Sequence, residues 1–314
     1  MRIVIISKSK RHTKIYFYLK KAFQQLGHKA FWIKYPKLKS YFGEKTANSI
    51  TRKLLLGLKP DLLFLHGRDM PMELLRWAKK RMPVFVYYDD CIQGSGGDIH
   101  PVVAHGCEAD IMYITNRGEI PIYRKWGVNA KFITGGCDST AHRIVGAPGR
   151  YYQSDVAFIG KPNTPERVAC MQAVDERFDL KLWGSGWEKF GLAAASKNVY
   201  ASGYRKICAG AKIILGWNID PTVDLYFSNR TWYTLGCGGF LLTLYSPSLE
   251  TLFGRGRELD WFESIDECCQ KIEYYLGHPE ERQSIARAGY ELAHQKYNYI
   301  NMAEQILSDL ARRK

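Results

Sequence analysis

Short apolar runs and helix-period segments alternate along the first half of the chain. Residues 3–7 (IVIIS) have the length and β-branched composition of a buried strand, and residues 30–33 form a second such run. Between them, apolar side chains recur at the spacing of one helix face: Ile15, Leu19, Ala22, Phe23 and Leu26. This strand–helix–strand order predicts a parallel, doubly wound sheet.

The same alternation continues through the rest of the chain. We predict further strands at 62–65, 84–88, 111–115, 131–134, 155–159, 180–183, 212–215 and 240–243. We predict helices at 48–58, 71–81, 120–126, 165–175, 264–277, 279–294 and 299–312, and a short helix that begins near Asn229. Residues 134–152 are rich in glycine and lack periodicity, which is typical of a linker.

Two halves of this kind, joined by one linker, predict the fold class. We expect an α/β protein with two Rossmann-like domains, each a doubly wound parallel sheet. We place the domains at 1–148 and 149–298, followed by a C-terminal helix over 299–314 that packs back towards the N-terminal domain. Ligands of such sheets bind beyond the carboxyl ends of the strands, so we expect the site in a central cleft that the domains face.

The composition is that of a globular protein and sets the expected compartment. No apolar run reaches the roughly 18 residues that a membrane span requires, and residues 1–6 lack the long apolar region of a signal peptide. The eight cysteines include no Cys-x-x-Cys pair and no regular spacing, so we expect free thiols and no metal site. We therefore expect a cytoplasmic protein.

Positive charge is concentrated in the first half. Residues 1–150 hold 26 Lys and Arg and 11 Asp and Glu, a net charge of +15, whereas residues 151–314 have a net charge of −1. A basic half indicates an anionic partner, for which a membrane surface, an acidic glycan and a nucleic acid are all open. Contact with an anionic membrane would place the protein peripherally at the inner face. A solvated basic face that aids solubility is an equal alternative.

The second half resembles a known family. Residues 228–262 (SNRTWYTLGCGGFLLTLYSPSLETLFGRGRELDWF) and 264–290 are similar to the donor-binding domain of GT-B glycosyltransferases, closest to the CgeB-like (glycosyl transferases group 1) subgroup. Residues 154–160 (SDVAFIG), 182–187 (LWGSGW) and 203–218 (GYRKICAGAKIILGWN) resemble earlier elements of that domain. The first half is only generically similar.

This resemblance implies an enzyme that takes a sugar from a UDP-, GDP- or dTDP-linked donor. The acceptor, bound by the N-terminal domain, would be a glycan, a lipid-linked molecule, a protein or a small molecule. The resemblance also implies no permanently bound cofactor, retention of the anomeric configuration, and independence of metal ions, because GT-B enzymes offset the diphosphate charge with protein groups. The oligomeric state stays open.

The leaving diphosphate needs groups that stabilise negative charge. A helix N-terminus with an adjacent cation does this, and the helix that begins at Ser228, Asn229 and Arg230 fits: Ser228 or Asn229 caps it, and Arg230 reaches the diphosphate. Gly160 follows a strand and lets the backbone approach a phosphate, while Lys161 supplies a cation. We rank Arg167 below Lys161. Each charged residue could instead form a surface salt bridge.

The resemblance reveals one departure, at the ribose. Many retaining GT-B enzymes hold the ribose with a Glu just before the glycine stretch, and Tyr233 occupies that position here. Asp224, Glu250 and Glu258 are alternative carboxylates, each of which could instead be a solvated surface group. The candidates to stack on the base, with core packing as the alternative for each, are Tyr204, Trp217, Tyr200 and Trp183.

Polar side chains follow two predicted strands of the first domain. Asp89 and Asp90 come after 84–88, and His66 comes after 62–65. One of these groups could orient the acceptor hydroxyl or act as a catalytic base. The alternatives are a loop cap for either Asp and a satisfied polar role for His66. Residues 93–98 (QGSGGD) form a glycine-rich loop that could close over the acceptor.

Two other functions stay open. The basic first half would suit a GT-B enzyme that glycosylates the bases of nucleic acid. The Tyr233 departure would suit a catalytically degenerate GT-B protein that only binds a partner.

Overall fold

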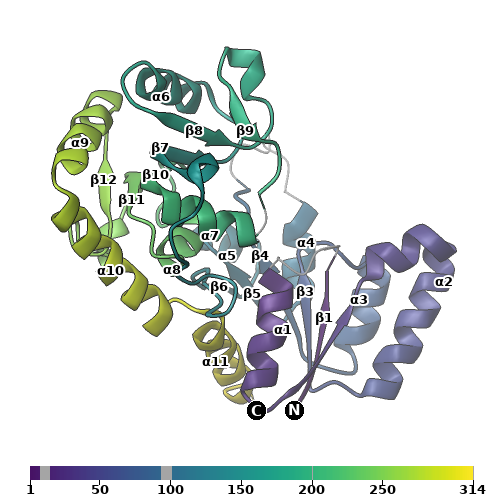
Figure 1. The fold of residues 1–314 in the computed structure, drawn as a ribbon. Coiled ribbons are helices and arrows are strands. Elements are labelled where there is room, and N and C mark those ends of the chain that lie inside the picture. The colour runs from purple at the N-terminus through teal and green to yellow at the C-terminus, as the bar shows by residue number, and fades with distance from the viewer. Residues whose placement is uncertain (8–14, 93–100, 200, 314) are drawn as a thin grey trace. The chain divides into compact units, whose positions relative to one another are not determined.

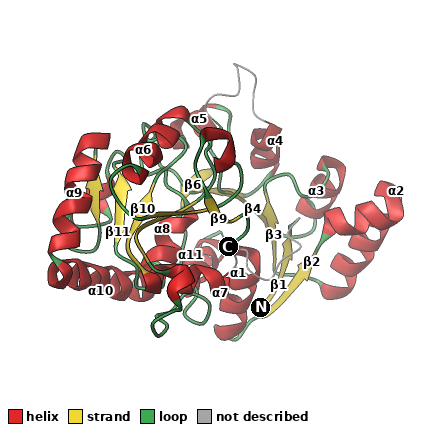
Figure 2. Ribbon diagram, turned by 45° about the horizontal axis from the view of Figure 1, so that its top comes forward, coloured by secondary structure: helices red, strands yellow, loops and turns green. Residues whose placement is uncertain are grey.

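The computed structural model describes residues 1–7, 15–92, 101–199 and 201–313 and divides into two units. Unit 1 comprises Met1–Thr134 and Tyr299–Lys314, and unit 2 comprises Gly135–Asn298. Each unit is built on a six-stranded sheet whose neighbouring strands run parallel (Figure 1). Helices (red) flank the strands (yellow) of each sheet in Figure 2.

The sheet of unit 1 has the order β2-β1-β3-β4-β5-β6. Its strands are β1 (Arg2–Ile6), β2 (Lys29–Ile33), β3 (Leu62–His66), β4 (Val84–Tyr88), β5 (Ile111–Ile114) and β6 (Ala130–Phe132). Its helices are α1 (Ile15–Gln25), α2 (Tyr35–Leu58), α3 (Met72–Lys79), α4 (Pro101–Glu108), α5 (Ile120–Lys125) and α11 (Tyr299–Ala311). The strands are continuous apolar runs because helices cover both faces of the sheet.

Helix α11 belongs to unit 1 although it follows all of unit 2 in the chain. It packs against α1, where the rings of Tyr18 and Tyr299 stack with centroids 5.3 Å apart. The buried carboxylate of Asp309 accepts hydrogen bonds from the Tyr113 hydroxyl at 2.7 Å and from Lys131 Nζ at 2.6 Å. These contacts fasten the end of the chain to strands β5 and β6.

The sheet of unit 2 has the order β12-β11-β10-β7-β8-β9. Its strands are β7 (Ser154–Ile159), β8 (Leu180–Trp183), β9 (Ala194–Ser196), β10 (Ala211–Gly216), β11 (Leu241–Leu244) and β12 (Asp260–Phe262). Its helices are α6 (Pro165–Asp175), α7 (Ala201–Gly210), α8 (Asn229–Gly236), α9 (Ile265–Gly277) and α10 (Pro279–Gln295). Successive residues of β7 face opposite cores, so Val156 and Phe158 pack in one apolar cluster and Ala157 and Ile159 in another.

The strand orders confirm the predicted fold class and locate the crevices where ligands bind. In unit 1 the order reverses between β1 and β3, and in unit 2 it reverses between β7 and β10. The helices that follow neighbouring strands then lie on opposite faces, which leaves a crevice at the carboxyl ends of those strands. The residues at these two places are therefore the ones to inspect for chemistry.

Several elements differ from the sequence prediction. The pattern missed α4, α7, β9 and β12, and it began α2 at residue 48, whereas α2 begins at Tyr35. Gly43 interrupts α2 with a left-handed backbone (φ 75°, ψ 167°), which hides the helical period of its first part. Strands β9 and β12 have three residues each, too few for a period-two pattern to be recognised. None of the helices in the described residues is long and apolar enough to cross a membrane.

Candidate active site

The Arg230 side chain lies across the strand reversal of unit 2. Its Nη1 donates a hydrogen bond to the Ile159 carbonyl, at the end of β7, at 2.6 Å. Its Nη2 donates to the Trp217 carbonyl, just beyond β10, at 3.2 Å. The guanidinium therefore joins the carboxyl ends of the two central strands, in the crevice where sheets of this kind bind ligands.

The start of α8 aims this side chain. Ser228 is the N-cap, and its Oγ accepts hydrogen bonds from the Arg230 backbone N–H at 3.3 Å and from Arg230 Nε at 2.9 Å. The Ser228 N–H donates in turn to Oδ1 of the buried Asn218 at 3.0 Å. Ser228 thus caps the N-terminus of α8 and holds the Arg230 guanidinium in place. Asn218, in turn, binds Ser228 to the loop after β10.

Two glycines make room for the guanidinium. A Cβ on Gly160 would lie 2.0 Å from Arg230 Nη1 and 2.8 Å from the Phe158 ring. A Cβ on Gly184 would lie 2.1 Å from the Gly160 carbonyl oxygen, and Gly184 has a positive φ of 147°. Since real Cβ atoms do not approach other atoms this closely, any larger residue at either position would displace Arg230 or its support.

Arg167 places a second cation in the same crevice. It lies in the first turn of α6, whose N-cap Thr164 accepts a hydrogen bond from the Arg167 N–H at 3.3 Å. The side chain is 1% exposed, and it donates to the Lys161 carbonyl at 2.7 Å and to the Trp217 carbonyl at 3.2 Å. Its Nε is buried without a hydrogen-bond partner. The two guanidinium groups therefore share the Trp217 carbonyl as an acceptor.

These two cations have no carboxylate counterpart among the described residues. Within the described residues, no carboxylate contributes to the electrostatics of Arg167 or Arg230. Burial lowers the pKa of both groups, and the neighbouring charge of Arg230 helps to bring the pKa of Arg167 down to about 10. A buried cation without a partner is costly, so the crevice favours an anion that accepts hydrogen bonds.

In unit 1, His66 and Asp89 meet at the carboxyl ends of neighbouring strands. His66 is the last residue of β3, and Asp89 directly follows β4. The ring of His66 is held by Asp89 Oδ1, 3.2 Å from Nε2, and by Asp69 Oδ2, 2.9 Å from Nδ1. The Tyr16 ring packs against it with centroids 4.6 Å apart. The three polar side chains form an Asp–His–Asp cluster beside the β1/β3 reversal.

The His66 ring is a cation at neutral pH. Burial alone would lower its pKa, but the hydrogen bonds to Asp69 and Asp89 outweigh burial and raise the pKa to about 9. Both ring nitrogens then donate, so His66 cannot itself take a proton from an acceptor. Asp89 remains partly exposed and Asp90 is exposed, so carboxylates are the groups here that can meet a hydroxyl. The predicted loop 93–98 lies outside the described residues.

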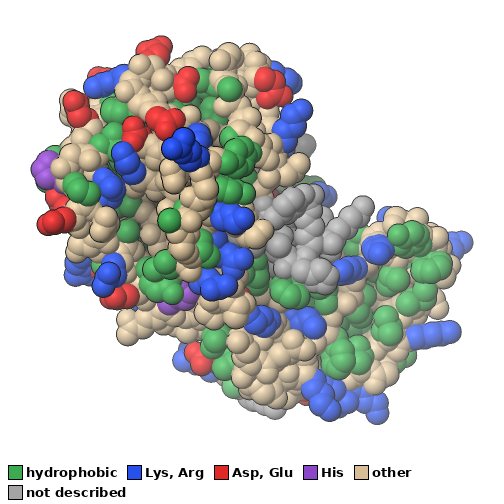
Figure 3. All heavy atoms as spheres, in the orientation of Figure 1, with side chains coloured by type: hydrophobic (Ala, Val, Ile, Leu, Met, Phe, Trp, Pro, Cys, Tyr) green, Lys and Arg blue, Asp and Glu red, His purple; other side chains and the backbone are tan. Residues whose placement is uncertain are grey.

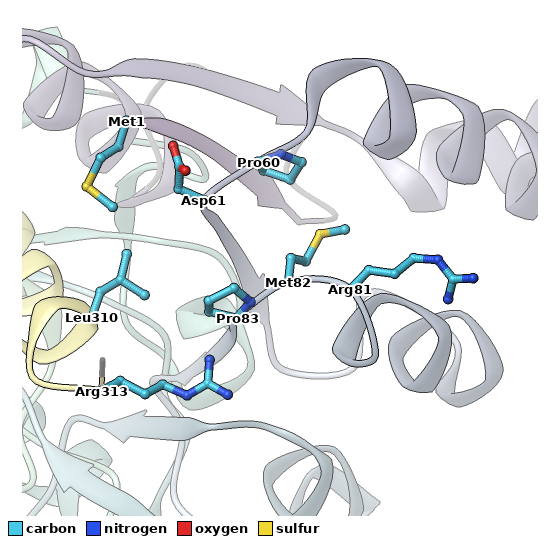
Figure 4. A pocket seen from close by; sticks show the side chains of 8 residues that line it. All are labelled: Met1, Pro60, Asp61, Arg81, Met82, Pro83, Leu310 and Arg313. Carbon is cyan, nitrogen blue, oxygen red and sulfur yellow. The ribbon is translucent and has the colours of Figure 1, made fainter.

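Unit 1 also has a hollow, which lies at the edge of the sheet opposite to the His66 cluster. It has a volume of about 450 Å³, and Figure 4 shows eight residues that line it: Met1, Pro60, Asp61, Arg81, Met82, Pro83, Leu310 and Arg313. Met1 precedes β1, Asp61 precedes β3 and Pro83 precedes β4, so the hollow opens at the amino ends of the strands. Because ligands of parallel sheets bind at the carboxyl ends, we do not assign the candidate site to it.

Comparison with known proteins identifies a domain of a known family and the fold. Residues 167–308 match the model of the family described as "Glycosyl transferase-like". Anabaena HepE, solved in complex with UDP and glucose and with UDP-glucose, aligns with a TM-score of 0.70 over 99% of this chain and 100% of its own, at 12% identity. Residues 167–308 are thus a glycosyl transferase-like domain, and the chain has the GT-B fold. No protein with a curated description matches it in sequence.

Two further structures share this GT-B fold. Sucrose-phosphate synthase from Thermosynechococcus elongatus aligns with a TM-score of 0.67 at 12% identity, over 99% of this chain and 98% of its own. An alpha-glucosyltransferase in complex with UDP-glucose and DNA containing an abasic site aligns with a TM-score of 0.68 at 11% identity, over 99% of each chain. These findings confirm the family resemblance and the fold class.

The residues predicted around the diphosphate of this GT-B protein lie close together but contribute differently. Ser228, Arg230 and Gly160 meet in one crevice. Asn229 opens α8, and its Oδ1 would lie 2.7 Å from a Cβ on Gly135. The Lys161 side chain is exposed, and its backbone carbonyl serves Arg167.

The residues predicted around the ribose and the base mostly pack within unit 2. The Tyr233 ring stacks on His142 with centroids 4.2 Å apart. The Tyr204 hydroxyl is buried against the Arg230 carbonyl at 3.2 Å and Thr234 Oγ1 at 2.9 Å, so it supports α8. Trp217 contributes its carbonyl, while its ring packs in the core near Phe262.

Two of the alternative carboxylates also have structural partners. The exposed Glu250 accepts a hydrogen bond from the Tyr245 hydroxyl at 3.1 Å. Glu258 is not the solvated surface group that we considered, because it is only 6% exposed and accepts a hydrogen bond from the Gly254 N–H at 2.6 Å. It closes a tight loop rather than facing water.

Sequence reasoning underrated Arg167 and overlooked Asp69. Arg167 stands in the first turn of the capped helix that follows β7, and Arg230 stands in the first turn of another capped helix. This shared placement could have identified Arg167 as a candidate from the sequence. Asp69 lies three residues after His66 in a turn, a spacing that any short loop allows. Only the fold shows that Asp69 and Asp89 flank the same ring.

Proposed function

We propose that this protein transfers a sugar from a nucleotide-diphosphate sugar to a hydroxyl acceptor, with the diphosphate bound by Arg230 and Arg167. The observation that carries the proposal is a pair of guanidinium groups, the buried Arg167 and the half-buried Arg230, with no described carboxylate beside them. A diphosphate supplies the missing negative charge and several acceptor oxygens. The crevice between β7 and β10 is where a Rossmann-like sheet presents such a ligand.

The same cations suit the chemical step. When the bond from the sugar to the diphosphate breaks, negative charge grows on the leaving oxygen. Guanidinium groups already fixed in place stabilise that charge without rearrangement, which is the most effective form of electrostatic catalysis. We therefore propose transfer that does not depend on a divalent ion. Turnover that persists in excess EDTA supports this, and turnover that stops until a divalent ion is restored contradicts it.

Uridine diphosphate is the first donor nucleotide to test, because HepE and the alpha-glucosyltransferase were solved with UDP-glucose. GDP and dTDP sugars are the alternatives. A thermal-shift series with UDP, GDP and dTDP should raise the melting temperature of the protein for at least one, since a ligand that binds only the folded state stabilises it by mass action. No shift with any of the three would contradict the proposal.

On the acceptor side we propose that Asp89 orients the attacking hydroxyl and that His66 holds Asp89 in place. The hydrogen bond from the charged His66 ring to Asp89 supports this division. The acceptor is a glycan, a lipid-linked molecule, a protein or a small molecule. The resemblance of the donor domain favours retention at the anomeric carbon. An NMR spectrum of the first-formed product decides, since a product of inverted configuration contradicts retention.

The experiment that tests the activity is transfer or slow hydrolysis of labelled nucleotide sugars. We expect released nucleotide with the wild-type protein and none with Arg230→Met. Arg282→Met is the matched control, because Arg282 is another buried arginine of unit 2 that donates to a backbone carbonyl, that of Tyr275. Its charge is near Asp155, at the amino end of β7, whereas the candidate site lies at the carboxyl end. Activity that survives Arg230→Met would contradict the proposal. No activity with any donor would favour the degenerate, binding-only alternative.

A second candidate acceptor is nucleic acid. The alpha-glucosyltransferase that shares this fold was solved with DNA, and unit 1 of this chain is strongly basic. If duplex DNA is the acceptor, its binding should weaken steeply with added salt as phosphate counterions are released, and a labelled sugar should appear on the DNA. DNA that is not retained at low salt excludes this version and leaves the donor proposal intact.

A further inference from the structure

Helix α2 is the least covered helix of unit 1. Of its 24 residues, four are buried: Tyr35, Ala47, Thr51 and Leu55. The left-handed backbone of Gly43 bends the helix into two arms, which Figure 1 shows at the outer side of unit 1. A single buried stripe packs the second arm against the domain, and Leu38 and Leu58 also contact the core, but most other residues of both arms are exposed.

This outward surface carries large apolar side chains. Tyr41 is 68% exposed and Phe42 is 55% exposed, and both stand directly before the bend at Gly43. Leu54 and Leu56 on the second arm are 42% and 54% exposed. Isolated exposed apolar residues are ordinary, and Leu54 and Leu56, two positions apart, lie on different sides of the helix. The neighbouring rings of Tyr41 and Phe42, however, have centroids 6.3 Å apart and form one exposed aromatic pair, which indicates a surface that meets something other than water.

Lysines surround these apolar side chains. Residues 34–59 contain seven Lys and Arg and one Glu, a net charge of +6. Lys39 pairs with Glu44 and Arg52 pairs with Glu73, each at 2.5 Å. Lys37, Lys45 and Lys53 have no carboxylate partner among the described residues. In Figure 3 green and blue side chains dominate the outer part of unit 1 around α2.

Exposed aromatic side chains next to lysines with no described carboxylate contact favour one class of partner. A second copy of the chain would bring one cluster of +6 against another, which repels. A nucleic acid would satisfy the lysines, but its phosphates gain nothing from exposed leucines. An anionic bilayer satisfies both, because lysines bind the headgroups while aromatic and aliphatic side chains enter the interface between headgroups and acyl chains.

We propose that α2 docks the protein on an anionic membrane surface, with Tyr41 and Phe42 inserted at the bend and Lys37, Lys45 and Lys53 against the headgroups. The proposal goes beyond the transfer reaction and does not depend on it, because donor binding lies in unit 2. It narrows the anionic partners that the charge of the first half leaves open to a lipid surface, at one named helix.

Sedimentation with vesicles tests the proposal. The full chain is mixed with vesicles of phosphatidylcholine alone or with about one third phosphatidylglycerol, at low and high salt. We expect binding to the anionic vesicles only, weakened by salt. Lys37→Gln/Lys45→Gln/Lys53→Gln should reduce the affinity on the order of 100-fold, at about 1 kcal/mol for each lysine near an anionic surface. Tyr41→Ser/Phe42→Ser should reduce it at least about tenfold, because the apolar contact is lost.

A matched control separates α2 from charge and apolar exposure in general. Lys189 and the 42%-exposed Phe190 form an exposed Lys–Phe pair in unit 2, so Lys189→Gln/Phe190→Ser should leave vesicle binding unchanged. Circular dichroism confirms that each variant folds. Binding to neutral vesicles with equal affinity, or binding that Tyr41→Ser/Phe42→Ser leaves intact, overturns the proposal. So does a chain dimer or a DNA complex that these two substitutions abolish while vesicle binding persists.

Discussion

The two units place opposite charges at the ends of their strands, and in each the local charge differs in kind from the charge of the whole. Unit 1 holds 27 Lys and Arg against 12 Asp and Glu, a net charge of +15, yet its strand ends present two carboxylates around a histidine. Unit 2 holds 18 Lys and Arg against 19 Asp and Glu, a net charge of −1. Yet its strand ends hold the buried Arg167 and the half-buried Arg230, with no carboxylate beside them among the described residues.

This difference shows that the net charge of a unit does not predict the charge of the groups at its strand ends. The excess of unit 1 lies on surfaces such as α2 and concerns the partner that the unit meets. We propose that the groups at the strand ends serve the reaction: cations in unit 2 for a leaving diphosphate, and a carboxylate in unit 1 for an acceptor hydroxyl. Substituting either set of groups therefore tests one side of this contrast.

The largest effect is expected when the cations of unit 2 are removed. Arg167→Met/Arg230→Met should weaken binding of the preferred nucleoside diphosphate about 1,000-fold, since each buried charged contact contributes a few kcal/mol. The unliganded variant should stay folded, because buried cations without partners contribute little stability. Titration calorimetry measures the affinity, and Arg282→Met should bind as the wild type does. Unchanged affinity of the double variant would sink the diphosphate assignment.

In unit 1 the corresponding change is Asp89→Asn. Turnover should fall on the order of 100-fold, the usual contribution of a positioned acid–base group. Donor affinity should stay unchanged, because the proposed donor site is in unit 2. Asp61→Asn is the control, since Asp61 lies at the amino end of β3 in the same sheet and accepts a hydrogen bond from the Arg2 N–H. Equal losses for Asp89 and Asp61 would show that the carboxyl edge has no special role.

The histidine of unit 1 predicts a dependence of stability on pH. The folded-state pKa of His66 is raised from 6.5 to about 9, so its contribution is complete below pH 6.5 and is lost as pH rises through about 9. The expected loss is about 3 kcal/mol, since one pKa unit corresponds to about 1.4 kcal/mol. Urea unfolding at pH 6 and pH 9.5 measures it for unit 1, and His66→Gln should abolish the difference. A difference that persists in His66→Gln must come from other groups.

A smaller effect is expected from Gly160→Ala. The new Cβ would meet Arg230 Nη1 and push the guanidinium off the end of β7, so nucleotide affinity should fall roughly tenfold. Gly146→Ala is the control, since a Cβ there meets nothing within 4 Å. Calorimetric titration compares the two variants. Equal affinities would mean that the crevice adapts and that Arg230 does not need this fixed position.

Most of the fold follows from the hydrophobic pattern, and the site follows only in part. Strands such as β4 and β7 are apolar runs bounded by turns, so the sequence predicts them. The start of α8 is predictable too, because the N-cap Ser228 binds a backbone N–H only two residues away. The His66–Asp89 contact joins residues 23 positions apart, and the shared Trp217 carbonyl joins α6 to α8. Such contacts depend on strand order, which no local pattern contains.

The central claim is that Arg167 and Arg230 bind the diphosphate of the donor, and one comparison tests it most directly. Affinities of the preferred nucleoside diphosphate and of its bare nucleoside are measured for the wild type and for Arg167→Met/Arg230→Met. We predict that the diphosphate binds the wild type at least about 100-fold more tightly than the nucleoside does, and that this ratio falls towards one in the variant. A ratio that the double substitution leaves unchanged would contradict the account.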